Sequence, residues 1–429
     1  MNTRTAVVTV ALACLNLTAI ALQSEDDPAL FPAGQLLVAS PGSGAIAAYD
    51  EGGGTLPQPV TGLQSPQDLA FASDGALFVS DADLDLVLVT DAGGTVLDAL
   101  GGDSPLSQPA GLAFGPDGAL FVASAGTDSV MSFDRSGAFR AEIGAADGLV
   151  APWGVAFGPD GRLHVASSGS NLIAIFDPSG TLVDALDGGG ALNAPTGLCF
   201  DGDGALWVSC AGNNRVLALD GQGAVLHSFD GDGQLDAPAG LVFGPDGLLY
   251  VACTGSQHIL ALDAAGHVIR VLALDGSAEA PRGLAFAPSL FKATLKGRMA
   301  RPGEKDLKFS SKAILAYAPG SAGWSLRLLD ADDALAAAWS SDTWVFHGRL
   351  AQAGPGAKVA VLGALQLGAA SAQEGLTAAQ LHLKGVAGQA PGAGVPSVFR
   401  PKSLAGDFHR SGPQGLASGT LKTSGLIKP

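Results

Sequence analysis

The sequence predicts an all-β fold: a six-bladed β-propeller closed by N-terminal strands that pair with the last repeat, followed by a smaller C-terminal antiparallel β barrel or sandwich. Three observations predict it. A prolyl phrase recurs six times at one interval, and an Asp-x-x-Gly turn recurs six times out of phase with it. The repetition and the excess of negative charge both end near residue 290.

The composition is that of a globular protein. Hydrophobic residues make up 47% of the 429 residues and charged residues only 15%. This excludes a disordered chain, because such chains bury too little apolar surface to offset the entropy of ordering. The 61 glycines and 25 prolines show no collagen-like period, so they indicate many turns between short strands. The length exceeds that of one ordinary domain.

Each prolyl phrase opens a unit of four short strands. The prolines stand 43 residues apart, at Pro66, Pro109, Pro152, Pro195, Pro238 and Pro281. In the second unit, residues 111–114 form a first strand, the Asp117-Gly118 pair a hairpin turn, and residues 119–123 a second strand. Strands over 129–133 and 138–143 complete the unit. Four antiparallel strands in about 43 residues is the size of one propeller blade.

The Asp-x-x-Gly turns show how the ring closes. They begin at Asp50, Asp91, Asp134, Asp177, Asp220 and Asp263. The first turn precedes the first prolyl strand, and none follows the last prolyl strand. Residues 35–60 therefore supply strands two to four of a blade whose first strand is residues 281–287. The predicted propeller domain spans residues 35–289.

The repeated phrase resembles the NHL-repeat six-bladed β-propellers. It reads Pro-x-Gly-Leu-Ala-Phe-x-Pro-Asp-Gly-x-Leu-aromatic-Val-Ala/Ser, followed by Phe/Leu-Asp-x-x-Gly. The resemblance covers about residues 35–287. It implies the fold strongly and the activity weakly, because that family includes partner-binding scaffolds, sensor domains and a few lyases.

The two ends of the chain differ from the repeats. Residues 1–21 have the pattern of a signal peptide, with Arg4 before an apolar run that ends in Ala19-Ile20-Ala21, and a linker is expected over 22–34. A membrane anchor and a lipid anchor at Cys14 are the alternatives. Cleavage predicts a secreted, periplasmic or cell-surface protein without a transmembrane segment.

Residues 290–429 lose the period and carry sixteen Lys and Arg against eight Asp and Glu. Alternating runs within 291–296, 313–317, 324–328, 344–347, 381–384 and 419–422 predict half-buried strands, and residues 330–339 a short helix. The opposite charges of the two regions favour docking of this β-rich domain on the propeller. A plain difference in composition explains them equally well.

The resemblance implies where a binding site would lie. In such propellers the first strands line a central channel, and the loops before strand one share a face with the turns between strands two and three. The candidate binding residues on that face are Gln67, Asp68, Trp153, Thr196, Arg282, Asn213, Asn214 and His258. Asp68 replaces the glycine of the other five repeats. With Arg282 it forms either a polar cluster at the channel mouth or an ion pair that tethers the closing blades.

Metal sites have weaker signals. Asp81, Asp83 and Asp85 resemble a calcium loop, yet the glycine and the bidentate glutamate of an EF-hand are absent, and turn chemistry explains Asp-rich loops equally well. No histidine lies on a first strand, so a catalytic metal is not expected, and His164 stands where other repeats have a packed aromatic residue. No cofactor is expected beyond structural calcium.

The cysteines and the net charge limit the remaining functions. Cys199, Cys210 and Cys253 allow one disulfide at most, and buried free thiols are favoured. A net charge of −17 argues against binding to nucleic acid. The sequence therefore predicts an exported, non-catalytic scaffold that binds a protein, peptide or glycan at the channel mouth. The alternatives are a metal-dependent lyase or lactonase with its site there, and a structural envelope or matrix protein.

Overall fold

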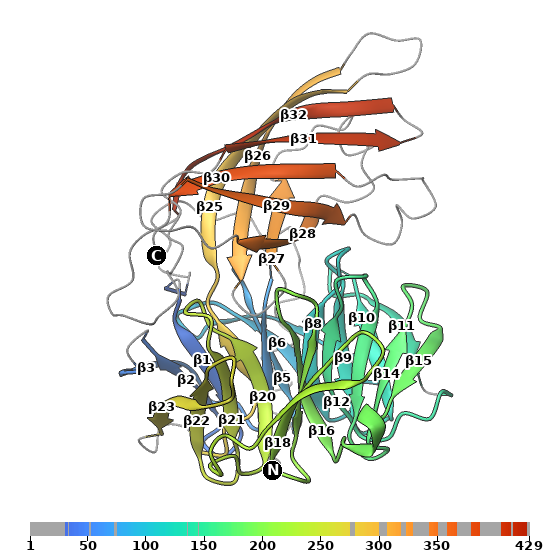
Figure 1. Ribbon diagram of the computed structural model, residues 1–429, viewed down its shortest axis with the longest axis vertical. Coiled ribbons are helices and arrows are strands. Elements are labelled where there is room, and N and C mark those ends of the chain that lie inside the picture. The colour runs from blue at the N-terminus through green and yellow to red at the C-terminus, as the bar shows by residue number, and fades with distance from the viewer. Residues whose placement is uncertain are drawn as a thin grey trace.

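The computed structural model (Figure 1) describes residues 31–299, apart from 33, 51–52, 73–74, 135, 145 and 275–278, together with the strands found within 307–426. The predicted signal peptide, nearly all of the predicted linker and the predicted helix over 330–339 lie outside the described residues.

The described part of residues 35–287 forms six four-stranded antiparallel sheets. Blade one contains β24 (Leu284–Phe286), β1 (Leu36–Ser40), β2 (Ala45–Tyr49) and β3 (Thr55–Thr61). Blade two contains β4 (Pro66–Phe71), β5 (Leu77–Asp81), β6 (Leu86–Thr90) and β7 (Val96–Leu100). Blade three contains β8 (Pro109–Phe114), β9 (Leu120–Ser124), β10 (Ser129–Phe133) and β11 (Phe139–Ile143).

The other three blades follow at the same interval. Blade four contains β12 (Pro152–Phe157), β13 (Leu163–Ser167), β14 (Leu172–Phe176) and β15 (Leu182–Leu186). Blade five contains β16 (Pro195–Phe200), β17 (Leu206–Cys210), β18 (Arg215–Leu219) and β19 (Val225–Phe229). Blade six contains β20 (Pro238–Phe243), β21 (Leu249–Cys253), β22 (His258–Leu262) and β23 (Val268–Ala273). The prediction of a six-bladed β-propeller is confirmed.

The two ends of the repeat region meet in blade one, as predicted. β24 pairs antiparallel with β1, with Leu36 opposite Phe286 and Val38 opposite Leu284. Two further backbone bonds extend the seam, from Ala39 N to the Gly283 oxygen at 2.9 Å and from Arg282 N to the Ala39 oxygen at 3.0 Å. The closed ring leaves no blade without a neighbour on either side.

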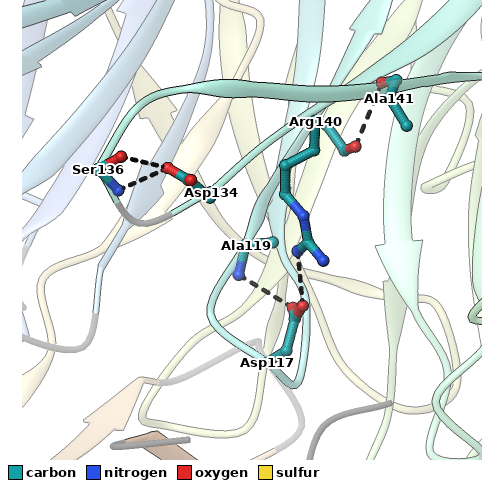
Figure 2. Close-up of polar contacts among 7 residues, drawn as sticks. Asp117, Ala119, Asp134, Ser136, Arg140 and Ala141 are labelled. Atoms are coloured by element: carbon teal, nitrogen blue, oxygen red, sulfur yellow. Dashed lines mark hydrogen bonds and ion pairs between the residues drawn. The ribbon is translucent and has the colours of Figure 1, made fainter. Parts of the chain in front are cut away.

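Burial follows the order of strands within a blade. β10 is buried at every residue because blades pack on both of its faces, whereas β11 at the perimeter is almost wholly exposed. The turn between them is fixed by Asp134, whose Oδ1 accepts bonds from the amide and the hydroxyl of Ser136 (Figure 2). Gly137 completes this turn with a φ of 81°, which favours glycine.

Aromatic contacts join neighbouring blades. The aromatic residue of a second strand packs edge-to-face on the phenylalanine that ends the next first strand, as in Phe121–Phe157, with ring centres 5.0 Å apart. His164 makes the same contact with Phe200 at 5.0 Å and is buried, and this burial lowers the pKa of its imidazole. The prediction of a packed histidine is confirmed.

The C-terminal region begins three residues after β24. Its described strands form one antiparallel sheet in the order β30-β29-β28-β27-β26-β25-β32-β31. They are β25 (Ser289–Met299), β26 (Leu307–Ala318), β27 (Gly323–Leu328), β28 (Thr343–Leu350), β29 (Lys358–Gln366), β30 (Ala379–Val386), β31 (Ala405–Gly412) and β32 (Gly415–Leu426). The six predicted strands all lie within this set, and β29 and β31 were not predicted. A barrel or sandwich here stays a prediction.

No helix in the described part of the chain has the length and apolar character that a membrane span requires.

Candidate functional site

The propeller has two faces, and the C-terminal region is attached to one of them. We call the mouth face the one where first strands begin and strands two and three are joined, and the hairpin face the opposite one. The chain leaves the propeller on the hairpin face, where Ala287 N donates to the Gln35 oxygen at 2.8 Å and Gly34 N donates to the Ala287 oxygen at 3.0 Å. β25 therefore starts on the hairpin face and runs away from the propeller into the C-terminal sheet (Figure 1). The mouth face is on the other side.

The first strands pack closely around the axis. They contact one another in the cyclic order β4, β8, β12, β16, β20, β24. Glycine is required where they touch, because a Cβ at Gly111 would collide with the carbonyl oxygen of Trp153. The same collision would occur at Gly154, Gly197 and Gly240 with the carbonyl oxygens of Thr196, Ala239 and Arg282. This explains the glycine in the repeated phrase.

Asp68 occupies the glycine position of β4 and is therefore the exception in this ring. Its Oδ2 accepts a bond of 2.9 Å from the Leu112 amide of β8, and its Oδ1 lies against Gly283, the residue before β24. Its own amide donates to Ser80 Oγ at 3.0 Å. Burial raises the pKa of Asp68 to about 7, against the smaller opposing effects of the hydrogen bonds from Leu112 and Leu69. Asp68 is thus a channel-side carboxyl that changes charge near neutral pH.

Arg282 does not form the ion pair with Asp68 that was one of the two expectations. No ion pair joins them among the described residues. The guanidinium carbon instead lies 5.6 Å from the centre of the Trp153 ring. β24 and β12 are three places apart in a cycle of six, so this contact crosses the channel from one blade to the opposite one. The ion pair was expected because Asp68 and Arg282 are on adjacent strands, but the long side chain reaches the indole.

The guanidinium of Arg282 has no acceptor among the described residues. Its Nε is fully buried without a hydrogen-bond partner there, and burial lowers the pKa of the side chain from its ordinary value. Among the described residues, the indole face of Trp153 is the group that stabilises this half-buried cation. It is a donor group that is held in place and not used within the described structure.

Gln67 and Thr196 are held by neighbouring backbone and serine groups. Gln67 is buried, and its Nε2 donates to the oxygen of Ser65 at 3.0 Å and to its Oγ at 2.8 Å. Thr196 Oγ1 donates to the Pro238 oxygen at 2.9 Å and lies 2.9 Å from Ser209 Oγ. Both side chains lie at the mouth end of their strands, with most of their hydrogen-bonding capacity occupied.

In blades two to five, the turn between strands two and three ties the blade to the next one. Asn214 Oδ1 accepts the Ala237 amide at 2.9 Å, across a sequence separation of 23 residues. Asp85, Asp128 and Asn171 accept the amides of Gln108, Ala151 and Ala194 in the same way at 2.7–2.8 Å. All four have positive φ, which Asp and Asn tolerate better than most residues. Sequence reasoning missed this role, although Asp or Asn recurs there at the repeat interval.

Asn213 and His258 do not lie on the first strands that surround the axis. Asn213 is exposed, and its Nδ2 donates to the Ala191 oxygen at 3.1 Å. His258 is half-buried at the start of β22, where it faces Cys253 and Ala273 on the flanking strands. Neither residue is brought to Arg282 and Trp153, and their proposed part in binding stays a prediction.

The three aspartates predicted as a calcium loop in blade two are not arranged as metal ligands. Both oxygens of Asp81 accept backbone amides, from Gln64 at 2.8 Å and from Ser65 at 2.9 Å. Burial raises the pKa of Asp81 in spite of these bonds. Asp83 and Asp85 are exposed. Within the described residues, no three His, Cys, Asp or Glu side chains lie together as metal ligands would.

The three cysteines of the propeller are free and buried. Burial raises the pKa of the Cys253 thiol to about 11 and also raises the pKa values of the Cys199 and Cys210 thiols. Each thiol is therefore protonated near neutral pH. The expected free thiols are confirmed.

Comparison with known proteins adds a family match. Residues 29–301 match the model of the virginiamycin B lyase family. No curated protein matches the chain. The match and the six blades agree with the propeller fold that the resemblance implies, whereas membership of the NHL-repeat group itself stays a prediction.

The solved structures that are similar to this chain share a low sequence identity with it. A chain of the nidogen/laminin complex is 21% identical, with a TM-score of 0.50 over 59% of this chain and 98% of that one. The virginiamycin B lyase of Staphylococcus aureus is 16% identical, with a TM-score of 0.46 over 70% of this chain and 94% of that one.

Proposed function

The chain belongs to the virginiamycin B lyase family, and from this premise we propose that it is an exported scaffold whose mouth face binds a protein, peptide or glycan without converting it. The observation that carries the proposal is the contact of Arg282 with Trp153 across the channel. It places a guanidinium with unused donors against an aromatic wall. Arginine and tryptophan are the side chains most enriched at the energetic centres of binding sites.

The framework around this pair supports a binding role. The Asp and Asn ties between blades fix the loops of the mouth face, so a ligand there would meet a surface that is ordered before it binds. Among the described residues, the C-terminal sheet starts on the hairpin face, which is opposite the mouth face. The chain from the nidogen/laminin complex has the same fold within a protein–protein assembly, although their 21% identity extends to fold alone.

A lyase is the second candidate, and the family favours it. Asp68 would be the proton-transferring group, because a carboxyl with a pKa of about 7 is suited to general acid–base chemistry at neutral pH. A catalytic divalent metal does not fit this mouth. Both oxygens of Asp68 lie against neighbouring backbone, and no histidine lies on the described first strands. Three protein ligands would be needed for such an ion.

The test uses the purified full chain on peptide and glycan arrays. The variants Trp153→Ala and Arg282→Gln remove the mouth pair, and Arg140→Gln is the matched control. Arg140 is exposed on β11 and pairs with Asp117 at 2.8 Å (Figure 2). We expect a ligand whose signal falls at least tenfold in both mouth variants and not in the control.

The proposal is overturned when no ligand is retained, or when every retained ligand binds the mouth variants as well as the unchanged protein. Mass spectrometry of the ligand after incubation separates the two candidates. Recovery of the unchanged ligand supports a scaffold. Conversion that is lost in Asp68→Asn supports the lyase instead.

A further inference from the structure

We propose that the mouth recognises a single carboxylate group that is attached to an apolar or ring-shaped moiety. This inference rests on the proposed function and specifies the chemistry of its ligand. Two features of the described residues support it: a guanidinium without an acceptor and an aromatic wall beside it.

The Arg282 guanidinium is the anchor. Its Nε is buried without a partner among the described residues, and its planar group is held at 5.6 Å from the Trp153 ring centre. The side chain as a whole is half-buried, and a bound anion would supply both the opposite charge and the acceptor that the buried Nε lacks. The fork of N–H groups matches the two oxygens of a carboxylate. The ligand therefore places its carboxylate at Arg282.

The aromatic wall determines what the carboxylate is attached to. Trp153 is half-buried at the start of β12, opposite β24 in the ring. Apolar groups and sugar rings pack on an indole, whereas a strongly hydrated ion gains little there. A small inorganic anion would leave this surface without a contact.

Asp68 fits a carboxylate ligand when it is protonated. It lies on β4 next to Gly283, the residue that follows Arg282. Its Oδ2 accepts the Leu112 amide and its Oδ1 lies against Gly283, so Asp68 acts on a ligand at Arg282 through its charge alone. In the ionised form it repels an anion.

The overall charge limits the ligand to one anionic group. The chain carries a formal net charge of −17. Polyanions such as nucleic acids and heavily sulfated glycans are repelled at long range, while a single carboxylate pays a much smaller cost. The remaining sources are a free peptide C-terminus and a uronic acid.

The experiment compares acids with neutral analogues of the same shape. N-acetyl-leucine and its amide represent the peptide terminus, and glucuronic acid and glucose represent the sugar. Ligand-observed NMR on the full chain at pH 6 gives the dissociation constants for the unchanged protein, Arg282→Gln and the Arg140→Gln control. We expect one acid to bind at least tenfold more tightly than its neutral partner, and this difference to disappear only in Arg282→Gln.

Equal binding of an acid and its neutral analogue overturns the carboxylate inference while leaving a binding face. Absence of binding by all four probes also overturns it, and the array experiment then judges the proposed function separately. If Arg282→Gln does not fold, thermal unfolding of the unchanged protein with each probe replaces it. The acid must then raise the unfolding temperature, and the neutral analogue must not.

Discussion

Arg282 lies two residues before β24 and Trp153 lies at the start of β12 in the opposite blade, and their side chains meet across the channel with the guanidinium carbon 5.6 Å from the ring centre. A contact between opposite blades does not depend on the pairing of strands within any sheet. It therefore links two blades that are not next to each other in the ring.

This link predicts a measurable coupling energy. In a double-mutant cycle with Arg282→Gln and Trp153→Leu, we expect the two changes to be non-additive by about 0.5–2 kcal/mol, the usual range for a cation–π contact that is partly desolvated. The measurement is urea unfolding of the four proteins. Additive changes would show that the pair does not interact in solution.

Asp68 predicts a stability that falls as pH rises. The folded pKa of about 7 exceeds the ordinary value of 3.8, so the folded state binds more protons between these two pH values, and its stability declines across this window. The full difference is about 4 kcal/mol. Asp68→Asn keeps an acceptor for the Leu112 amide and cannot ionise.

We therefore expect Asp68→Asn to be more stable than the unchanged protein at pH 8 and to lose that advantage near pH 4. Asp81 on β5 and Arg282, two residues before β24, are the other ionisable side chains on or next to the strands packed against β4, and both remain in the variant. Urea unfolding across the pH range gives the comparison. A stability difference that does not vary with pH would contradict the raised pKa.

The close packing at the glycines of the first strands predicts that one added methyl group lowers the stability of the protein. In Gly154→Ala the new Cβ would collide with the Thr196 carbonyl, and the backbone must shift to admit it. Overpacking of this kind costs about 1–3 kcal/mol. The control is Gly221→Ala, where a Cβ meets nothing within 4 Å. Thermal unfolding should show a lower transition for the first variant alone.

The ties between blades predict a difference between two substitutions at one position. Asn214→Ala loses the acceptor for the Ala237 amide and places alanine at a φ of 56°. We expect a loss of about 0.5–2 kcal/mol, as for other side chains that cap backbone amides. Asn214→Asp keeps the acceptor and should retain most of the stability. Equal losses in both variants would show that the amide bond is not the cause.

The buried thiols predict slow chemistry in the folded protein. Cys199, Cys210 and Cys253 are buried with raised pKa values, so little thiolate is present at pH 8. Iodoacetamide should label them only after unfolding, as peptide mapping by mass spectrometry would show. Rapid labelling of Cys253 in the native protein would contradict its burial.

The architecture could be predicted from the sequence because it depends on periodicity. The constant interval gave the number of blades, and the phase of Asp50 relative to Pro66 gave the closure between β1 and β24. The Asp134 turn followed from the known preferences of Asp and Gly in hairpins. These features depend on local chemistry and repetition, and both are visible in the amino-acid sequence.

The geometry of the mouth could be predicted only in part. Sequence spacing placed Asp68 and Arg282 on adjacent strands, but the direction of a long side chain depends on the width of the channel, which the glycines keep narrow. The interblade role of Asn214 had a sequence signal in the recurrence of Asp and Asn, yet the same residues also suit ligand-binding loops. Only coordinates distinguish these uses.

The pairing of β1 with β24 has a consequence for synthesis. β1 is synthesised some 245 residues before its partner β24. A growing chain therefore presents an unpaired backbone edge at Leu36–Ser40 until Leu284–Phe286 has been synthesised. A polypeptide that stops short of that point carries five complete sheets and one open edge. Such a product is prone to self-association, and cellular quality control would act on it before it binds a ligand.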